Sequence, residues 1–124
     1  MTMRYLSIFK SAETGVPPTQ EEMAAMGQLI DKYVRAGHLI STEGCLPSRL
    51  GMRVRRNGAS TKITDGPFTE AKEVVGGFAI FNVESKEQMV ELCKEFLDVV
   101  GDGECEVRQL YEAPALAEAS ARCA

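Results

Sequence analysis

The sequence predicts an α+β domain, in which a small antiparallel sheet carries two helices on one face. Runs of strand-forming residues alternate with two amphipathic segments, each of which repeats apolar residues at intervals of three and four. Both segments begin with a helix-capping pattern and end at a glycine. With 124 residues and 13.5 kDa, the chain has the size of one domain. We expect that domain to span residues 1–113, followed by a tail at 114–124.

The N-terminal third predicts the first strand and the first helix. Residues 3–10 are rich in strand formers, and the Gly-Val-Pro-Pro run at 15–18 interrupts regular structure. Thr19 and Glu22 form a capping box, which satisfies free amides at a helix start. Gly37 offers a C-terminal stop, so the helix should end near Ala36. The apolar stripe that should face the sheet consists of Met23, Met26, Ile30, Tyr33 and Val34.

The middle of the chain predicts short strands and a hairpin. A second strand at 38–41 precedes a loop at 43–48. Two extended runs, at 52–56 and 60–64, are joined through Asn57-Gly58, a pair that tolerates the positive φ of tight hairpin turns. The hairpin is polar on much of both faces. We therefore expect it at a sheet edge or as a flap over the sheet.

The C-terminal half completes the pattern. Residues 77–83 are apolar on both faces, as in a central strand that is covered on each side. A second helix begins at the Ser85 and Gln88 capping pattern and stops at Gly101, and a last strand covers 104–111. The apolar stripe of that helix consists of Met89, Leu92, Cys93, Phe96 and Val100. This order is that of a ferredoxin-like βαββαβ sheet with an inserted hairpin.

The central strand also predicts a partner for the sheet. In this topology both helices lie on one face, so one chain leaves the other face bare. Soluble monomers rarely expose apolar patches larger than a few hundred Å². We therefore expect a homodimer that packs two sheets face to face.

Charge and composition exclude several classes of function. A net charge of −4 argues against direct nucleic-acid binding, which rests on clustered Lys and Arg. No apolar run approaches the roughly 20 residues that span a bilayer, and the N-terminus lacks a signal-peptide pattern, so we expect a cytoplasmic protein. The cysteines, which should be reduced and should bind no metal, are Cys45, Cys93, Cys105 and Cys123. We expect no cofactor.

Residues 64–73 concentrate a turn signal, an aromatic side chain and four ionisable groups just before the central strand. In a structural interpretation, Asp65 accepts turn amides, Phe68 anchors the loop, and Gly76 or Gly77 marks a close backbone approach. In a functional interpretation, partial burial gives one carboxylate the pKa of a general base while Lys72 stabilises a developing anion. The carboxylates that would line such a cleft are Asp65, Glu70 and Glu73.

Two further groups are candidates for chemistry. His38 is the only histidine, and a catalytic role would need a distant partner such as Asp65. Arg53 and Arg55 share one face of a strand and could clamp a carboxylate or phosphate. The same arginines could instead protect an edge strand against aggregation.

The segment Asp65-Gly66-Pro67-Phe68, followed by Glu70, Lys72-Glu73 and Gly76-Gly77-Phe78, resembles the signature of the DGPF proteins, a branch of the YCII-related family. The resemblance extends from Tyr5 to the last strand. It implies a dimeric α/β barrel of ferredoxin-like subunits, and in some members an association with extracytoplasmic-function sigma factors. Other family members are thought to use a histidine and an aspartate on the first helix as an acid-base pair, where Met26 and Arg35 stand here.

Three functional hypotheses follow. The first is a small-molecule-binding protein, with a regulatory role among the options, whose pocket uses Arg53, Arg55, Phe68, Glu70 and Gly77. The second is a cofactor-free lyase or isomerase with Asp65 or Glu73 as base and Lys72, Arg53 or His38 as electrostatic partner. The third, which rests on the resemblance alone, is an interaction partner of a sigma factor.

Overall fold

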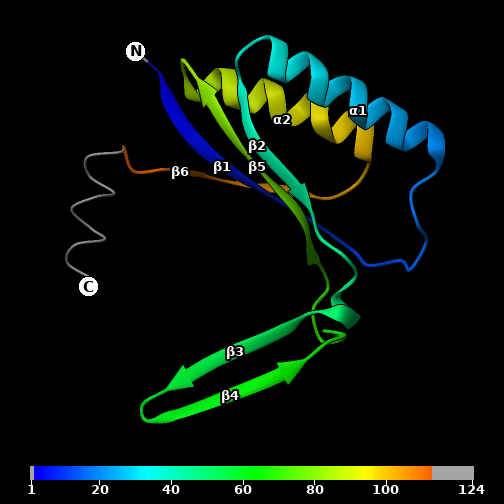
Figure 1. Ribbon diagram of the computed structural model, residues 1–124, viewed down its shortest axis with the longest axis vertical. Coiled ribbons are helices and arrows are strands. Elements are labelled where there is room, and N and C mark those ends of the chain that lie inside the picture. The colour runs from blue at the N-terminus through cyan, green and yellow to red at the C-terminus, as the bar shows by residue number, and fades with distance from the viewer. Residues whose placement is uncertain (1, 113–124) are drawn as a thin grey trace.

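A four-stranded antiparallel sheet with two helices on one face forms the body of the protein (Figure 1). The computed structural model describes residues 2–112. The predicted tail at 114–124, with Cys123, lies outside these residues. The elements are β1 (Met3–Ser11), α1 (Gln20–Arg35), β2 (Leu39–Gly44), a short 3-10 turn (Ser48–Leu50), β3 (Met52–Asn57), β4 (Ser60–Asp65), β5 (Val74–Val83), α2 (Lys86–Val100) and β6 (Glu104–Gln109).

The strand order β2-β5-β1-β6 places β1 and β5 at the centre. The pairing sets Tyr5 opposite Phe81 on one face and Leu6 opposite Ile80 on the other. A mixed α+β architecture was predicted, and this arrangement is consistent with a ferredoxin-like fold. The predicted end of β2 was wrong, since Glu43 and Gly44 still pair with β5. Backbone pairing with a central strand overrides the loop composition of that segment.

The core lies between the sheet and the helices. Its buried side chains come from both layers and are Tyr5, Leu29, Tyr33, Phe81, Val83 and Met89. The stripe predicted for α2 is confirmed at Met89, Leu92, Cys93 and Phe96. The stripe predicted for α1 is partly wrong, because Met23 and Val34 are each 54% exposed and Leu29 is buried instead. Only the C-terminal half of α1 therefore closes the core.

Both predicted helix starts are confirmed. Thr19 and Glu22 make both hydrogen bonds of a capping box at α1. At α2, the Ser85 side chain accepts from the amide of Gln88, while the Gln88 side chain accepts from the amide of Glu84. Each contact satisfies an amide that has no partner within the helix.

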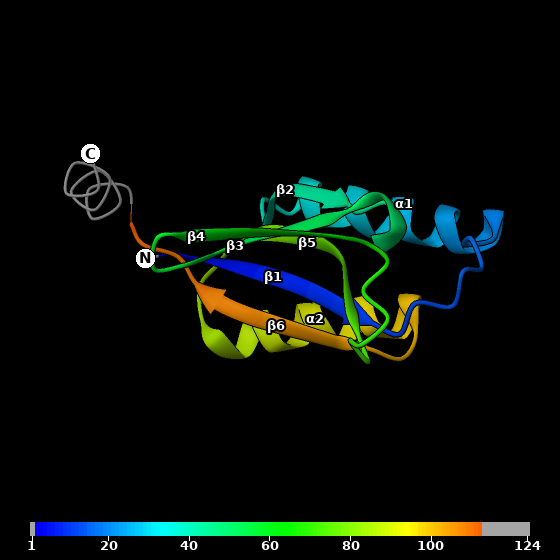
Figure 2. The same ribbon diagram turned by 90° about the horizontal axis from the view of Figure 1, so that it is seen from below.

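The hairpin β3–β4 forms a sheet of its own. Figures 1 and 2 together show it extending beneath the sheet on the side away from the helices. Its position at the edge of the main sheet, one of the two predicted placements, is therefore wrong. The two-residue turn is Gly58-Ala59, with φ 64° at Gly58, rather than Asn57-Gly58.

The hairpin also differs from its predicted polarity. Val54 lies opposite Ile63, and Met52 follows on the same face two residues away. Each of these three side chains is 64% exposed. One hairpin face is therefore apolar, while Arg53 and Arg55 lie on the other.

A polar link joins the two helices: Tyr33 and Lys32 of α1 both contact Glu95 of α2. The Tyr33 hydroxyl donates to Glu95 Oε1 at 2.6 Å and also lies 3.1 Å from the Leu92 carbonyl. Lys32 Nζ lies 2.6 Å from the other oxygen of Glu95. The Lys32 ammonium, and then the Tyr33 hydroxyl, lower the pKa of the Glu95 carboxyl. Burial, together with Glu95, raises the pKa of Tyr33.

Among residues 2–112, neither helix has the length and apolarity that a membrane span requires.

We expect Tyr33→Phe to lower the free energy of unfolding by about 1 kcal/mol, because it removes a buried hydrogen bond and keeps the ring. Urea denaturation measures the change. Tyr111→Phe is the matched control, because Tyr111 is exposed and contributes only its backbone carbonyl to Arg4. Equal stability of the Tyr33 variant and the wild type would show that the link contributes nothing.

The lowered pKa of Glu95 predicts a pH dependence of stability. Its contribution is present above the ordinary value of 4.5 and is lost as the pH falls through the lowered folded value. Glu95→Gln should therefore be less stable than the wild type at neutral pH, and this difference should shrink below pH 4.5. Urea denaturation at a series of pH values checks this. A difference that stays constant across the series contradicts it.

Candidate functional site

Residues 64–73, which we call the signature loop, hold the base of the hairpin against the segment before β3. The amide of Gly66 donates to the Gly51 carbonyl at 2.9 Å. A Cβ atom at Gly66 would lie 1.6 Å from the Ser48 carbonyl oxygen, so only glycine fits without backbone movement. The Gly66–Pro67 peptide bond is cis. Through Gly66, the backbone of this loop therefore packs directly against the backbone at Ser48 and Gly51.

Arg53, Phe68 and Glu70, all predicted site residues, come together in one cluster at this base. The Arg53 guanidinium lies 3.9 Å from the centroid of the Phe68 ring. It also forms an ion pair with Glu70, which lowers the pKa of that carboxyl. Arg55 shares the face of Arg53 and lies opposite Lys62. The charge of Arg53 is thus already neutralised, whereas Arg55 is exposed beside another cation.

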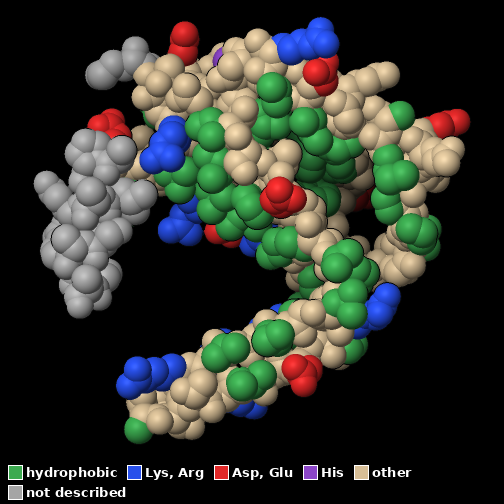
Figure 3. Space-filling view, in the orientation of Figure 1, with side chains coloured by type: hydrophobic (Ala, Val, Ile, Leu, Met, Phe, Trp, Pro, Cys, Tyr) green, Lys and Arg blue, Asp and Glu red, His purple; other side chains and the backbone are tan. Residues whose placement is uncertain are grey.

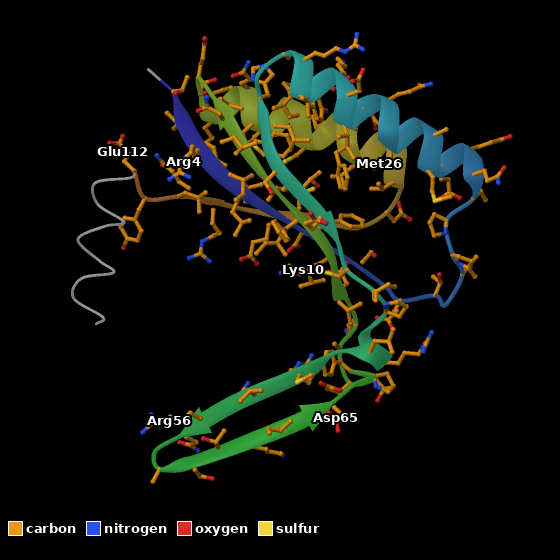
Figure 4. All side chains as sticks on the ribbon, in the orientation of Figure 1. Arg4, Lys10, Met26, Arg56, Asp65 and Glu112 are labelled. Carbon is orange, nitrogen blue, oxygen red and sulfur yellow. The ribbon has the colours of Figure 1, made fainter. Side chains whose placement is uncertain are left out.

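The other predicted acid-base groups are not gathered at one point. Asp65 ends β4 and is exposed (Figure 4). Glu73 is exposed just before β5. His38 lies near the opposite end of β5, roughly 25 Å along the strand from the loop. Its Nδ1 donates to the Asn82 carbonyl at 3.2 Å, and its Nε2 lies 3.4 Å from the Gln88 amide nitrogen. A base at Asp65 or Glu73 stays a prediction, and the structure does not bring His38 to either.

Two residues that sequence reasoning missed hold the loop in place. The Glu13 carboxylate accepts from the Ser48 hydroxyl at 2.8 Å and from the Ser48 amide at 3.2 Å. The Ser48 hydroxyl in turn accepts from the amide of Phe68 at 3.4 Å. A chain of hydrogen bonds therefore runs from the end of β1 to the signature loop. No local motif marks these contacts, because they join residues that are 20 to 35 positions apart.

A small polar cavity of about 320 Å³ lies beside this chain of hydrogen bonds, and we call it the signature cavity. Its polar lining residues are Glu13, Ser48, Thr69 and Lys72. Glu13 supplies hydrogen-bond acceptors and Lys72 supplies a cation. The signature cavity can therefore hold a small polar or anionic group.

A second and larger cavity, of about 1230 Å³, lies between the two helices and the sheet, is lined along α1 from Glu22 to Tyr33, and is called here the helix cavity. Its large apolar side chains include Phe9, Met26, Ile30 and Phe96. Phe9 and Phe96 meet edge to face, with ring centroids 5.2 Å apart. Charged side chains also lie on its lining, namely Glu13, Glu22, Glu43 and Arg49.

The two cavities lie next to each other. Ala12, Glu13 and Val74 contribute to the lining of both. Gly77, another predicted binding residue, lines the helix cavity, where a Cβ atom would lie 2.8 Å from the Glu43 carbonyl oxygen. Glycine there permits the close pairing of β2 with β5. The arrangement provides an apolar chamber that adjoins a polar one.

Within residues 2–112, no three His, Cys, Asp or Glu side chains lie close enough together to hold a metal ion.

Comparison with known proteins identifies the family of the chain. The pattern of the YCII-related domain matches residues 3–114. The chain belongs to the YCII-related family. It is also 30% identical over 80 residues to an uncharacterised protein of Rhizobium meliloti (strain 1021), a match that covers 64% of each chain. In this YCII-related protein, Met26 lines the helix cavity and Arg35 pairs with Asp31 at 3.0 Å on the surface of α1.

We expect Gly66→Ala to lower the free energy of unfolding by about 1–3 kcal/mol, because its methyl group collides with the Ser48 carbonyl. Gly44→Ala is the control, since a Cβ atom there meets open space. Chemical denaturation compares the two variants. If Gly66→Ala is as stable as Gly44→Ala, the loop is not held by this close contact.

Proposed function

We propose that this YCII-related protein binds a small organic acid with an apolar body, and that the chain is a member of the DGPF branch. The helix cavity carries the proposal. Small-molecule pockets typically measure about 300–1,000 Å³ and combine an apolar lining with a few polar groups. The volume of about 1230 Å³ leaves room for such a ligand and for some water.

The position of the two cavities next to each other suggests how the ligand would lie. The apolar body would pack against Phe9, Met26 and Phe96 in the helix cavity. The acid group would reach the signature cavity, where Lys72 offers a positive charge. Glu13 is held by Ser48 at the junction and would accept from a hydroxyl or amine on the ligand. The signature loop would then supply the polar end of the site rather than the whole site.

Arg53 has a supporting role in this proposal. Its guanidinium is stacked on Phe68 and paired with Glu70. These contacts position Phe68, which lines the signature cavity. Arg53 would therefore shape the wall of the cavity without contacting the acid group.

Dodecanoate tests the proposal, with dodecanol as the uncharged comparison. We expect dodecanoate to raise the melting temperature of the wild type, because a ligand that binds only the folded state stabilises it. Met26→Trp should reduce this shift, because its larger ring occupies the part of the helix cavity where the apolar body of the ligand would pack. Val34→Trp, on the exposed side of the same helix, should leave the shift unchanged.

A variant that removes the charge of Lys72 tests the polar end of the site separately from the apolar end. Lys72→Met should weaken dodecanoate binding about tenfold, the effect of losing one charge-assisted hydrogen bond, and leave dodecanol binding unchanged. Isothermal titration calorimetry measures both affinities. No binding of either compound to the wild type, or equal binding to Met26→Trp, would overturn the proposal for ligands of this class.

We also propose that a second copy of the chain covers the open face of the sheet. The side chains at its centre are half-buried and apolar, namely Leu6, Ile8, Phe78 and Ile80. Figure 3 shows hydrophobic side chains on the body across a hollow from the hairpin. The exposed apolar side chains of the hairpin, Met52, Val54 and Ile63, extend the surface that a partner would bury. Such a face is typical of an interface with twofold symmetry.

Ile80→Lys should convert the dimer to a folded monomer, because it places a charge at the centre of the proposed interface. Val90→Lys, on the exposed side of α2, should stay dimeric. Light scattering after gel filtration gives the mass of each, and circular dichroism shows that each is folded. A wild type that is monomeric at micromolar concentration contradicts the proposal.

A further inference from the structure

We propose that Cys93 and Cys105 form a redox-active dithiol in the wall of the helix cavity, which a hydroperoxide oxidises to an intramolecular disulfide. This inference goes beyond ligand binding and does not depend on it. It concerns two thiols that come from different elements, α2 and β6.

The geometry brings both thiols to one point. Cys105 lies opposite Phe9 in the β1–β6 pairing, so its side chain shares the helix-facing side of the sheet with Ser7. Cys93 Sγ lies 4.0 Å from Ser7 Oγ. Ser7 and Phe9 lie two residues apart on the same face of β1, so Cys105 lies diagonally across from Ser7, and both thiols line the helix cavity. The three side chains therefore form a compact cluster between α2 and the sheet.

Both thiols are free and accessible to a small reagent. Neither is in a disulfide, and both line the helix cavity. Each side chain is partly exposed rather than sealed in the core. A hydroperoxide is small enough to enter a cavity of about 1230 Å³.

The surroundings of the two thiols assign them different roles. The neighbouring Cys93 thiol lowers the pKa of Cys105 to about 7, even though burial opposes this change. The neighbouring Cys105 thiol, and then burial, raise the pKa of Cys93. Cysteine reacts as the thiolate, so Cys105 is the nucleophile and Cys93 the resolving thiol.

The chemistry proceeds in two balanced steps. The Cys105 thiolate attacks one oxygen of the hydroperoxide, the O–O bond breaks, and an alcohol or water leaves with a proton, so that Cys105 becomes a sulfenic acid. The Cys93 sulfur then attacks the Cys105 sulfur, the S–O bond breaks, and water leaves with the Cys93 proton. The two sulfurs lose two electrons in total, and the peroxide accepts both.

The test uses the full chain with Cys45→Ser and Cys123→Ser, so that only the proposed pair remains. After hydrogen peroxide treatment, we expect the intact mass to fall by the mass of two hydrogen atoms and both thiols to resist iodoacetamide. Dithiothreitol should reverse both changes. Peptide mapping should find Cys93 joined to Cys105.

Two single variants in the same background separate the roles. With Cys93→Ser, dimedone should trap the sulfenic acid at Cys105. With Cys105→Ser, Cys93 should react with peroxide more slowly than Cys105 does in the parent, because burial still disfavours the Cys93 thiolate. Circular dichroism confirms that both variants are folded.

Three results would overturn the proposal. One is that both thiols remain open to iodoacetamide at peroxide concentrations that oxidise the exposed Cys45 in the wild type. The second is oxidation to sulfinic acids without a disulfide in the parent. The third is a Cys105 that reacts no faster than Cys45. None of these measurements uses a cavity ligand, so their failure is distinguishable from failure of the proposed function.

Discussion

The antiparallel pairing of β1 with β5 is the constraint on which the rest of the structure depends. Its register sends Tyr5 and Phe81 to the helices and Leu6 and Ile80 to the opposite face. A slip of one residue would exchange these two sets and expose the core. β5 also begins directly after the signature loop, so the same pairing fixes where that loop stands. The register of β1 with β5 therefore fixes the positions of the core, of the open face and of the candidate site.

The main role of the signature loop in this structure is to hold the hairpin to the body of the protein. Gly66 packs on the Ser48 backbone, and Ser48 is held by Glu13, two residues after β1. The hairpin therefore connects to the body through a short set of backbone and hydroxyl contacts at its base. Such contacts demand particular residues at particular positions, as a binding site does. A specific sequence signature is thus compatible with a structural role and with a wall of a ligand cavity.

Much of the fold could be predicted from the sequence because local rules and global packing agree here. Caps at Thr19 and Ser85 and the apolar strand at 77–83 each mark their elements in a single stretch of chain. The candidate site could be predicted only in part. Phe68 and Lys72 lie within the recognisable loop, whereas Glu13 and Ser48 reach the site through long-range pairing that no local pattern encodes.

The helix cavity exists because α1 closes the core with only half of its length. Leu29 is buried, but Met23, almost two turns earlier, is 54% exposed. A Gly-Val-Pro-Pro linker precedes this end of the helix, and its prolines keep the helix from extending back toward β1. The space beneath is lined in part by methionine, whose flexible side chain adapts to different shapes. The incomplete packing of α1 therefore lowers the burial available for folding and leaves the chamber that both the proposed ligand and the Cys93–Cys105 pair require.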